Sequence, residues 1–311
     1  MGGTIVSFRA CFAAVLVSLI TVALPAQEPS PEAQRPTFRS SLDLVSVAVV
    51  VRDPDGRLVT NLRASDFEVF DRGSAQSIVQ FQRGGDADAR FALLVDSSGS
   101  MVVGAKRERS RIATELLAAG FKDSDAASVF SFDTRLRRLT FFTRNADELR
   151  AAVSSVQPFG MTGLYDAIVG TIETVVNEAP RTRALLLLTD GLENASLASP
   201  SDAASAAAAL DIPLYVLSVG KGEVDEKAIP SEAEQSAAVT LNELAVRTGG
   251  LAAEAATAAE LSVVTRTILT ELRHQYVLAF PAGSTKGWHE LSVRVKRGRV
   301  QARSRNGYYV S

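Results

Sequence analysis

Two continuous apolar runs constrain the fold of this 311-residue chain more than any other feature. One run occupies residues 91–95 (Phe-Ala-Leu-Leu-Val) and the other occupies residues 184–188 (Ala-Leu-Leu-Leu-Leu). A strand with one face in water alternates apolar and polar residues, whereas a strand buried on both faces is apolar throughout. Strand-like and helix-like segments alternate around these runs. The pattern therefore predicts an α/β domain with a doubly wound, mostly parallel central sheet flanked by helices.

The predicted elements of this α/β domain fill residues 89–275. Strands are expected at 91–95, 127–132, 136–142, 184–189, 213–219 and 251–254, the third of them at a sheet edge. Helices are expected at 105–120, 146–156, 163–177, 201–210, 240–248 and 258–274, and Asn145 is a favourable N-cap for the second of them. Residues 221–239 are polar and aperiodic, and we interpret them as a surface insertion.

Both ends of the chain carry short strand patterns separated by turn residues. The patterns lie at 42–51, 57–62, 67–70 and 76–82, and again at 276–280, 290–295 and 300–304. Either group alone would leave its strand edges unpaired. We therefore predict that an N-terminal β segment (38–84) and a C-terminal β segment (276–311) fold together into one small antiparallel β unit.

The first residues have the pattern of an export signal. Arg9 precedes an apolar run at 10–24, and a small residue, Ala26, ends a plausible cleavage site. An uncleaved membrane anchor is the alternative, but the run is shorter than the ~20 residues of a spanning helix. Residues 1–26 are thus predicted to be a signal peptide and 27–37 a linker. The mature protein would be exported, periplasmic, cell-surface or secreted, with no membrane span. Cleavage would remove Cys11, the only cysteine, and with it any disulfide or thiolate site.

The charge balance narrows the class of partner. The formal net charge is −2, which argues against nucleic acid because phosphate binding needs a basic footprint. The C-terminal segment alone is basic, carrying Arg303 and Arg305 among other cations. We interpret it as a solvated sheet face, with an anion-binding patch as the alternative.

Three polar segments follow or lie between the buried strands. The first is Asp96-Ser-Ser-Gly-Ser100, the second is a glycine-framed loop containing Thr162, and the third contains Asp190 directly after the second apolar run. In an open α/β sheet the ligand crevice lies at the carboxyl ends of the strands. If the two buried strands are neighbours, Asp96 and Asp190 meet there. Their oxygen atoms, with those of Ser98, Ser100 and Thr162, suit Mg²⁺, Mn²⁺ or Ca²⁺.

This pattern resembles the von Willebrand factor type A domain with its metal ion-dependent adhesion site, over residues 90–274. The resemblance implies that the hydroxyls of Ser98, Ser100 and Thr162 bind the metal directly. It also implies that Asp96 and Asp190 hold the metal largely through water. The flanking β segments, which include residues 66–71 and 307–309, are similar to those of a group of exported bacterial proteins related to this domain.

The resemblance implies a metal-dependent protein-binding module, exported from a bacterial cytoplasm, with an adhesion or scaffolding role. An Asp or Glu carboxylate of a protein partner would complete the coordination of the metal. We predict no enzymatic activity and no catalytic residues. Asp166 is expected to complement a helix amino terminus and Asp133 to lie in a strand-end turn, so neither is assigned to the metal.

Two other functions compete with this interpretation. One is a metal-dependent hydrolase or phosphatase acting from the same strand-end site. A phosphatase of the aspartyl-phosphate type usually carries a second Asp where this chain has Ser98, and a Ser–His–Asp hydrolase needs a positioned histidine. The only histidines, His274 and His289, fall outside the loops of the site. The other is a structural envelope component in which the metal only stiffens the fold.

Overall fold

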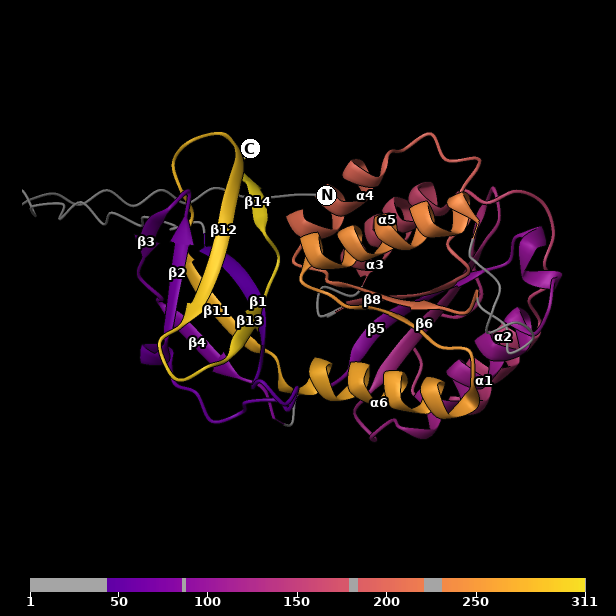
Figure 1. Cartoon of the computed structure of the whole chain (residues 1–311), viewed down its shortest axis with the longest axis horizontal. Helices are drawn as coiled ribbons and strands as arrows, with labels where there is room; N and C mark the ends of the chain where they lie inside the picture. Colours follow the sequence, from indigo (N-terminus) through magenta and orange to yellow (C-terminus); the bar gives the residue numbers. More distant parts are fainter. Residues whose placement is uncertain (1–43, 86–87, 179–183, 221–230, 311) are drawn as a thin grey trace, which may run out of the picture. The chain divides into compact units, whose positions relative to one another are not determined.

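A computed structural model describes residues 44–85, 88–178, 184–220 and 231–310. The predicted signal peptide and linker lie outside these residues, as do residues 221–230 of the predicted insertion. The described residues form a mostly parallel α/β domain and antiparallel sheets built from both ends of the chain (Figure 1). The predicted fold class is confirmed.

The central sheet has six strands in the order β10-β9-β8-β5-β6-β7. All neighbouring strands run parallel except β6 and β7, which are antiparallel. The strands are β5 (Arg90–Asp96), β6 (Ala126–Phe132), β7 (Leu136–Arg138), β8 (Ala184–Thr189), β9 (Leu214–Ser218) and β10 (Ala252–Glu254). The two apolar runs are therefore adjacent strands at the centre of the sheet.

Helices cover both faces of this sheet, as the apolar runs require (Figure 1). Along β5, Phe91, Leu93 and Val95 pack in a cluster with helices on one face, whereas Ala92 and Leu94 pack in a cluster on the other. The first face carries α1 (Lys106–Ala119), α2 (Ala146–Ser154) and α6 (Ala258–His274). The second carries α3 (Leu164–Glu178), α4 (Pro200–Ala209) and α5 (Glu232–Thr248).

Helix α2 begins at the predicted cap. The Asn145 side chain accepts hydrogen bonds from the backbone N–H groups of Asp147 (2.9 Å) and Glu148 (3.4 Å). We expect Asn145→Ala to lower the free energy of unfolding by about 1 kcal/mol, because two N–H groups lose their acceptor. Urea denaturation of the purified protein measures the change. Asn145→Ser retains a capping oxygen and should be nearly neutral; equal losses in both variants would contradict a capping role.

The two ends of the chain supply the strands of two further sheets, which we call the terminal β unit. One sheet has the order β13-β1-β11-β4 and the other β14-β12-β2-β3. Val47 pairs with Leu278 in the first and Val69 with Val293 in the second. Both sheets contribute to one apolar cluster. The strands are β1 (Leu44–Arg52), β2 (Phe67–Asp71), β3 (Ser74–Gln76), β4 (Gln80–Arg83), β11 (Tyr276–Pro281), β12 (Gly287–Val295), β13 (Gln301–Arg303) and β14 (Gly307–Val310).

Three strand predictions need correction. Residues 57–62 form only an isolated bridge at Leu58, because the Tyr276 hydroxyl binds the backbone of Val59 and Leu62 in place of a neighbouring strand. Residues 76–82 divide between β3 and β4, which belong to different sheets. The edge strand β7 ends at Arg138. The backbone N–H groups of Leu139 and Thr140 both donate to the carbonyl of Val129, which interrupts the regular hydrogen-bond ladder.

The predicted insertion is also partly wrong. Helix α5 begins at Glu232, so residues 232–239 are helical. Ser231 and Glu234 form a capping box, in which each side chain accepts a hydrogen bond from the backbone N–H of the other. The Ser-x-x-Glu spacing is a known helix start, and it was visible in the sequence.

Ion pairs join the α/β domain to the terminal β unit. Glu271 of α6 is fully buried and binds Arg52 of β1 (2.6 Å) and Arg303 of β13. Arg305 is buried against Asp211, which follows α4, and donates to the backbone carbonyl of Ser46. The expected solvated face is thus wrong for Arg303 and Arg305, whose guanidinium groups pair with carboxylates of the α/β domain.

A single residue, Gln275, separates α6 from β11, so the last helix continues directly into the terminal β unit (Figure 1). None of the helices in the described parts of the chain has the length and apolarity to cross a membrane.

Candidate metal site

The predicted site residues gather where β5 and β8 end. Asp96 is the last residue of β5, and Asp190 follows the last residue of β8. These strands are paired in parallel, with Val95 opposite Leu188, so the condition for their convergence is met. The Thr189 hydroxyl donates to Oδ2 of Asp96 over 2.6 Å and ties the two strand ends together.

Asp96 is a buried carboxylate held in a fixed orientation. Its Oδ1 accepts the backbone N–H of Ser98 at 2.8 Å, and its Oδ2 accepts the Thr189 hydroxyl. Burial raises the pKa of the Asp96 carboxyl to about 6, and the negative charge of Asp190 acts in the same direction. Two negatively charged carboxylates that repel each other in a buried place attract a cation.

The loop after β5 places two hydroxyls together. Oγ of Ser98 and Oγ of Ser100 lie 3.0 Å apart, and Ser98 is buried. Ser98 precedes a short 3₁₀ helix, η2 (Gly99–Val102), whose tight turn brings the two alternate side chains to the same side. The two serines therefore present adjacent oxygen atoms beside Asp96.

The loop containing Thr162 lies against both strand-end loops. The backbone N–H of Gly99 donates to the carbonyl of Gly160 over 2.9 Å, next to Ser98 and Ser100. On its other side, the N–H of Thr162 donates to the side chain of Asn194 (2.8 Å) in the segment after Asp190. The structure thus brings together the three loops that carry the predicted site residues.

Asp133 and Asp166 have other partners. Asp133 accepts the backbone N–H of Arg135 and pairs with Arg137 in the turn after β6. Asp166 lies in the first turn of α3, and its carboxylate accepts the backbone N–H groups at positions 197 and 198. Both carboxylates stabilise loops around the site.

Sequence reasoning missed three residues of this region. Asn194 holds the backbone of Thr162, as described above. Glu193 accepts the backbone N–H of Leu164 at the start of α3 and that of Ala195. The polar run that follows Asp190 was the available signal, although side chains that bind only backbone leave no spacing rule. The third is Lys106, which is the first residue of α1.

Lys106 places an ammonium group directly on Asp190. Its Nζ lies 2.8 Å from Oδ2 of Asp190, and the Asp190 side chain is only 1% exposed. Oδ1 of Asp190 accepts the N–H of Leu192 at 3.2 Å. This ion pair shows that the local environment stabilises a positive charge beside the candidate site.

The donor set fits a hard divalent cation. It combines the carboxylates of Asp96 and Asp190 with the hydroxyls of Ser98, Ser100 and Thr162, all of them oxygen donors. In the described part of the chain, no group of three or more His, Cys, Asp or Glu side chains could hold a metal. Hydroxyls are therefore essential to any metal site at this place, and the ammonium of Lys106 is a cation already accommodated there.

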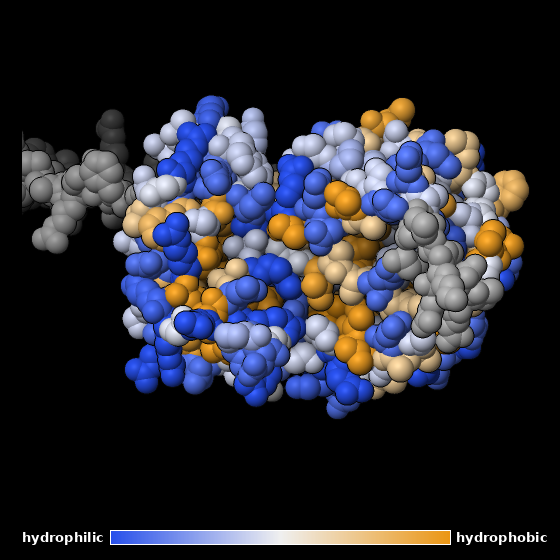
Figure 2. Space-filling view, viewed as in Figure 1, coloured by the Kyte–Doolittle hydropathy of each residue, from blue (hydrophilic) through white to orange (hydrophobic). Residues whose placement is uncertain are grey.

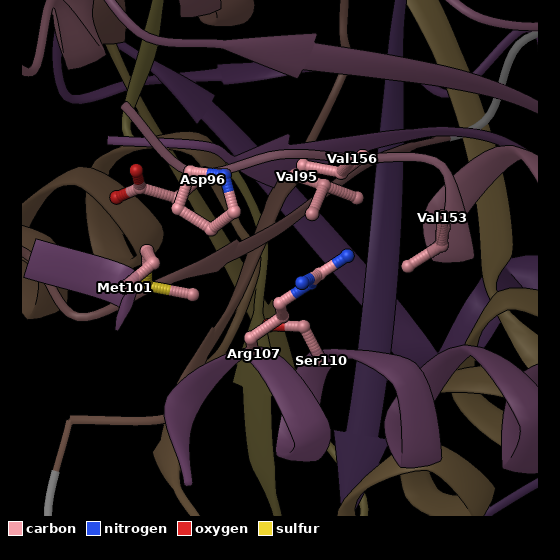
Figure 3. A pocket seen from close by; sticks show the side chains of 8 residues that line it. Val95, Asp96, Met101, Arg107, Ser110, Val153 and Val156 are labelled. Carbon is pink, nitrogen blue, oxygen red and sulfur yellow. The ribbon is translucent and has the colours of Figure 1, made fainter. Parts of the chain in front are cut away.

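A small cavity adjoins the site on the α1 side (Figure 3). In the close-up, Asp96 lies at one end and Val153 at the other, with Arg107 and Ser110 of α1 below. The volume of about 10 Å³ is enough for one water molecule at most. Among the residues that the structure describes, none forms a hydrogen bond with the buried hydroxyl of Ser110. This cavity has no room for a substrate.

Residues 91–193 match the family model of the von Willebrand factor type A domain. The matched segment includes both buried strands and all five predicted site residues. The chain contains a von Willebrand factor type A domain. None of the curated proteins matches the chain.

Solved structures similar to this chain include other type A domains. An aerotolerance-related membrane protein from Bacteroides fragilis is 16% identical, with 59% of this chain and 98% of that chain covered and a TM-score of 0.48. A von Willebrand factor type A protein from Catenulispora acidiphila is 12% identical, with 88% and 75% covered and a TM-score of 0.48. Proximal thread matrix protein 1 from the mussel byssus, solved with a zinc-occupied metal ion-dependent adhesion site, is 15% identical, with 61% and 49% covered and a TM-score of 0.46.

Exposed apolar side chains border the loops of the site. Val102 and Val103 follow Ser100, and Phe159 and Met161 flank Gly160 in the loop of Thr162; all four are more than half exposed. Leu197, in the segment after Asp190, is 98% exposed. Figure 2 shows hydrophobic side chains at the outer margin of the type A domain. Apolar groups gathered around a polar centre are typical of a protein-binding surface.

Proposed function

We propose that this protein is a metal-dependent protein-binding module of an adhesion or scaffolding kind. Asp96, Ser98, Ser100, Thr162 and Asp190 would hold Mg²⁺, or Mn²⁺ or Ca²⁺ in its place. The observation that carries the proposal is that the loops after β5 and β8 are tied together through the buried Asp96 and that the Thr162 loop is hydrogen-bonded to both of them. A bound divalent ion supplies an electrophilic position that a carboxylate of a partner can occupy.

The surface around the site narrows the kind of partner. The proposed ligand is an Asp or Glu side chain of a protein, and the exposed Phe159 and Leu197 favour apolar residues beside that carboxylate. A charged ligand with an apolar surround gains affinity from both the metal and the removal of apolar surface from water.

Binding is favoured over catalysis by the placement of the titratable groups. His274 contacts the backbone of Thr270 on α6, and His289 binds Asp71 inside the terminal β unit, so neither faces the site. The hydrolase or phosphatase alternative would need a general acid or base there. We also propose that the protein is exported, on the signal-like pattern of residues 1–26.

The first test removes the hydroxyl of Thr162. We expect Thr162→Ala to weaken Mg²⁺ binding about 10- to 100-fold, because one oxygen of the donor set is lost. The backbone of Thr162 is held by Asn194, so the loop should keep its place. Calorimetric titration of the mature protein with Mg²⁺ and Mn²⁺ measures the affinity. Thr162→Ser retains the hydroxyl and serves as the control; unchanged affinity in Thr162→Ala would contradict the site.

The native protein and Thr162→Ala also test the chemistry of the proposed partner. Short peptides that carry Asp or Glu between apolar residues should bind in Mg²⁺ and be released by a chelator. Peptides with Asn or Gln at that position should not bind. Peptide binding that is unchanged by the chelator would favour the structural envelope component, in which a metal only stiffens the fold.

A further inference from the structure

We propose that Lys106 is an internal competitor of the divalent cation and sets the concentration at which the site loads. This inference rests on the proposed function, because it concerns the same site. Its ammonium would neutralise Asp190 in the metal-free protein and would have to leave when a divalent ion binds.

The contact between Lys106 and Asp190 is close and sheltered. The Lys106 side chain is 15% exposed and the Asp190 side chain 1% exposed, with 2.8 Å between Nζ and Oδ2. An ion pair this far from bulk water is weakly screened by solvent and salt. Both oxygens of Asp190 are engaged, Oδ1 by the N–H of Leu192 and Oδ2 by Lys106. A divalent ion that approaches Oδ2 of Asp190 therefore meets the positive charge of Lys106 at the same oxygen.

The position of Lys106 is unfavourable within its own helix. It is the first residue of α1, and the amino end of a helix carries a partial positive charge that disfavours a cation. The attraction of Asp190 compensates for this cost. Lys106 also offsets the repulsion between the buried carboxylates Asp96 and Asp190, which would otherwise be unopposed.

A divalent ion in the same place changes this balance. Two cations close together in a poorly solvated site repel each other strongly, so the ammonium and the metal exclude each other. Glu234, an exposed residue in the first turn of α5, offers the displaced ammonium another carboxylate. Hydrogen bonds from Ser231 chiefly lower the pKa of the Glu234 carboxyl, and the charge of Lys106 acts in the same direction. Lys106 can therefore turn toward solvent without losing every anionic neighbour.

The test compares native protein with Lys106→Met. We expect the variant to bind Mg²⁺ and Mn²⁺ at least tenfold more tightly in calorimetric titration. Without metal it should melt at a lower temperature, because Asp190 loses its partner. Lys296→Met is the matched control: it removes the same charge from an exposed residue of the terminal β unit, 3.9 Å from Glu68. Lys106→Gln removes the charge but can still donate to Asp190, and it replaces Lys106→Met if that variant does not fold.

The outcomes separate this inference from the function on which it rests. Tighter binding in Lys106→Met, with native affinity in Lys296→Met, supports both. Native protein that binds as tightly as Lys106→Met overturns the inference and leaves the metal site standing. Binding in Lys106→Met alone supports the inference but overturns metal dependence of the native protein, whose cation would then be the lysine itself. No binding in either protein overturns both.

Discussion

We expect Glu271→Ala to lower the free energy of unfolding by about 3 kcal/mol. Glu271 is fully buried in α6, and its two carboxylate oxygens bind Arg52 of β1 and Arg303 of β13. Removing the shared anion leaves two guanidinium groups facing each other in a partly buried space, and truncation of one member of such a cluster is strongly destabilising. Both arginines retain some contact with water, which keeps the loss at the lower end of the range for buried pairs.

Urea denaturation measures this loss of stability. It is followed by two spectroscopic signals, one from the type A domain and one from the terminal β unit. The matched control is Glu68→Ala, which breaks an exposed pair with Lys296 and should change stability by less than about 1 kcal/mol. If the type A domain and the terminal β unit unfold together in Glu271→Ala, the two signals will coincide at a lower midpoint. A loss no larger than that of Glu68→Ala would contradict the stabilising role assigned to Glu271.

The second large effect is expected at Asp96. Its substitution should weaken metal binding but should not destabilise the metal-free protein. Asp96→Asn should weaken Mg²⁺ binding at least 100-fold, because the proposed donor set loses one of its two negative charges. The metal-free variant should be as stable as the native protein or more so, since a buried charge and its repulsion by Asp190 are removed. Calorimetric titration and thermal melting without metal provide the two measurements.

Asp166→Asn is the control for Asp96→Asn. Its carboxylate also follows a site loop, but it accepts backbone N–H groups at positions 197 and 198. We expect native metal affinity and a small loss of stability. Native affinity in Asp96→Asn would refute the proposed site, and a large loss of stability in the metal-free form would identify Asp96 as a structural residue.

The parts of the fold that were predictable from sequence are those governed by one dominant force. The apolar runs of β5 and β8 have no polar position that could face water, which left a doubly covered sheet as the solution. Helix α6 has the predicted bounds, 258–274, because the Thr257 side chain caps one end and Gln275 is already extended at the other. The position of Asp96 and Asp190 after these two strands also placed them at one edge of the sheet, because β5 and β8 are parallel neighbours.

The failures occurred where long-range contacts decided the outcome. Arg303 and Arg305 lie in a basic tail, and their anionic partners Glu271 and Asp211 lie elsewhere in the sequence, so the pairing of these arginines left no local pattern. Lys106 was missed for the same reason, since its partner Asp190 is on another loop. The start of α5 was missed for a different reason. The capping box at Ser231 was visible in the sequence, but the alanines and polar residues that follow it show no apolar face at helical spacing.

The pairing of β1 with β11 and of β2 with β12 has a consequence for how the protein is made. Strands β1, β2 and β4 each pair with a strand that the ribosome delivers only after the whole type A domain, whereas β3 pairs with its sequence neighbour β2. The type A domain can fold during that interval, whereas β1 and β4 stay unpaired and β2 has only β3 beside it. Cellular factors that protect exposed strand edges would therefore act on the first segment of the nascent chain, and the closing of the terminal β unit would be the final step of maturation.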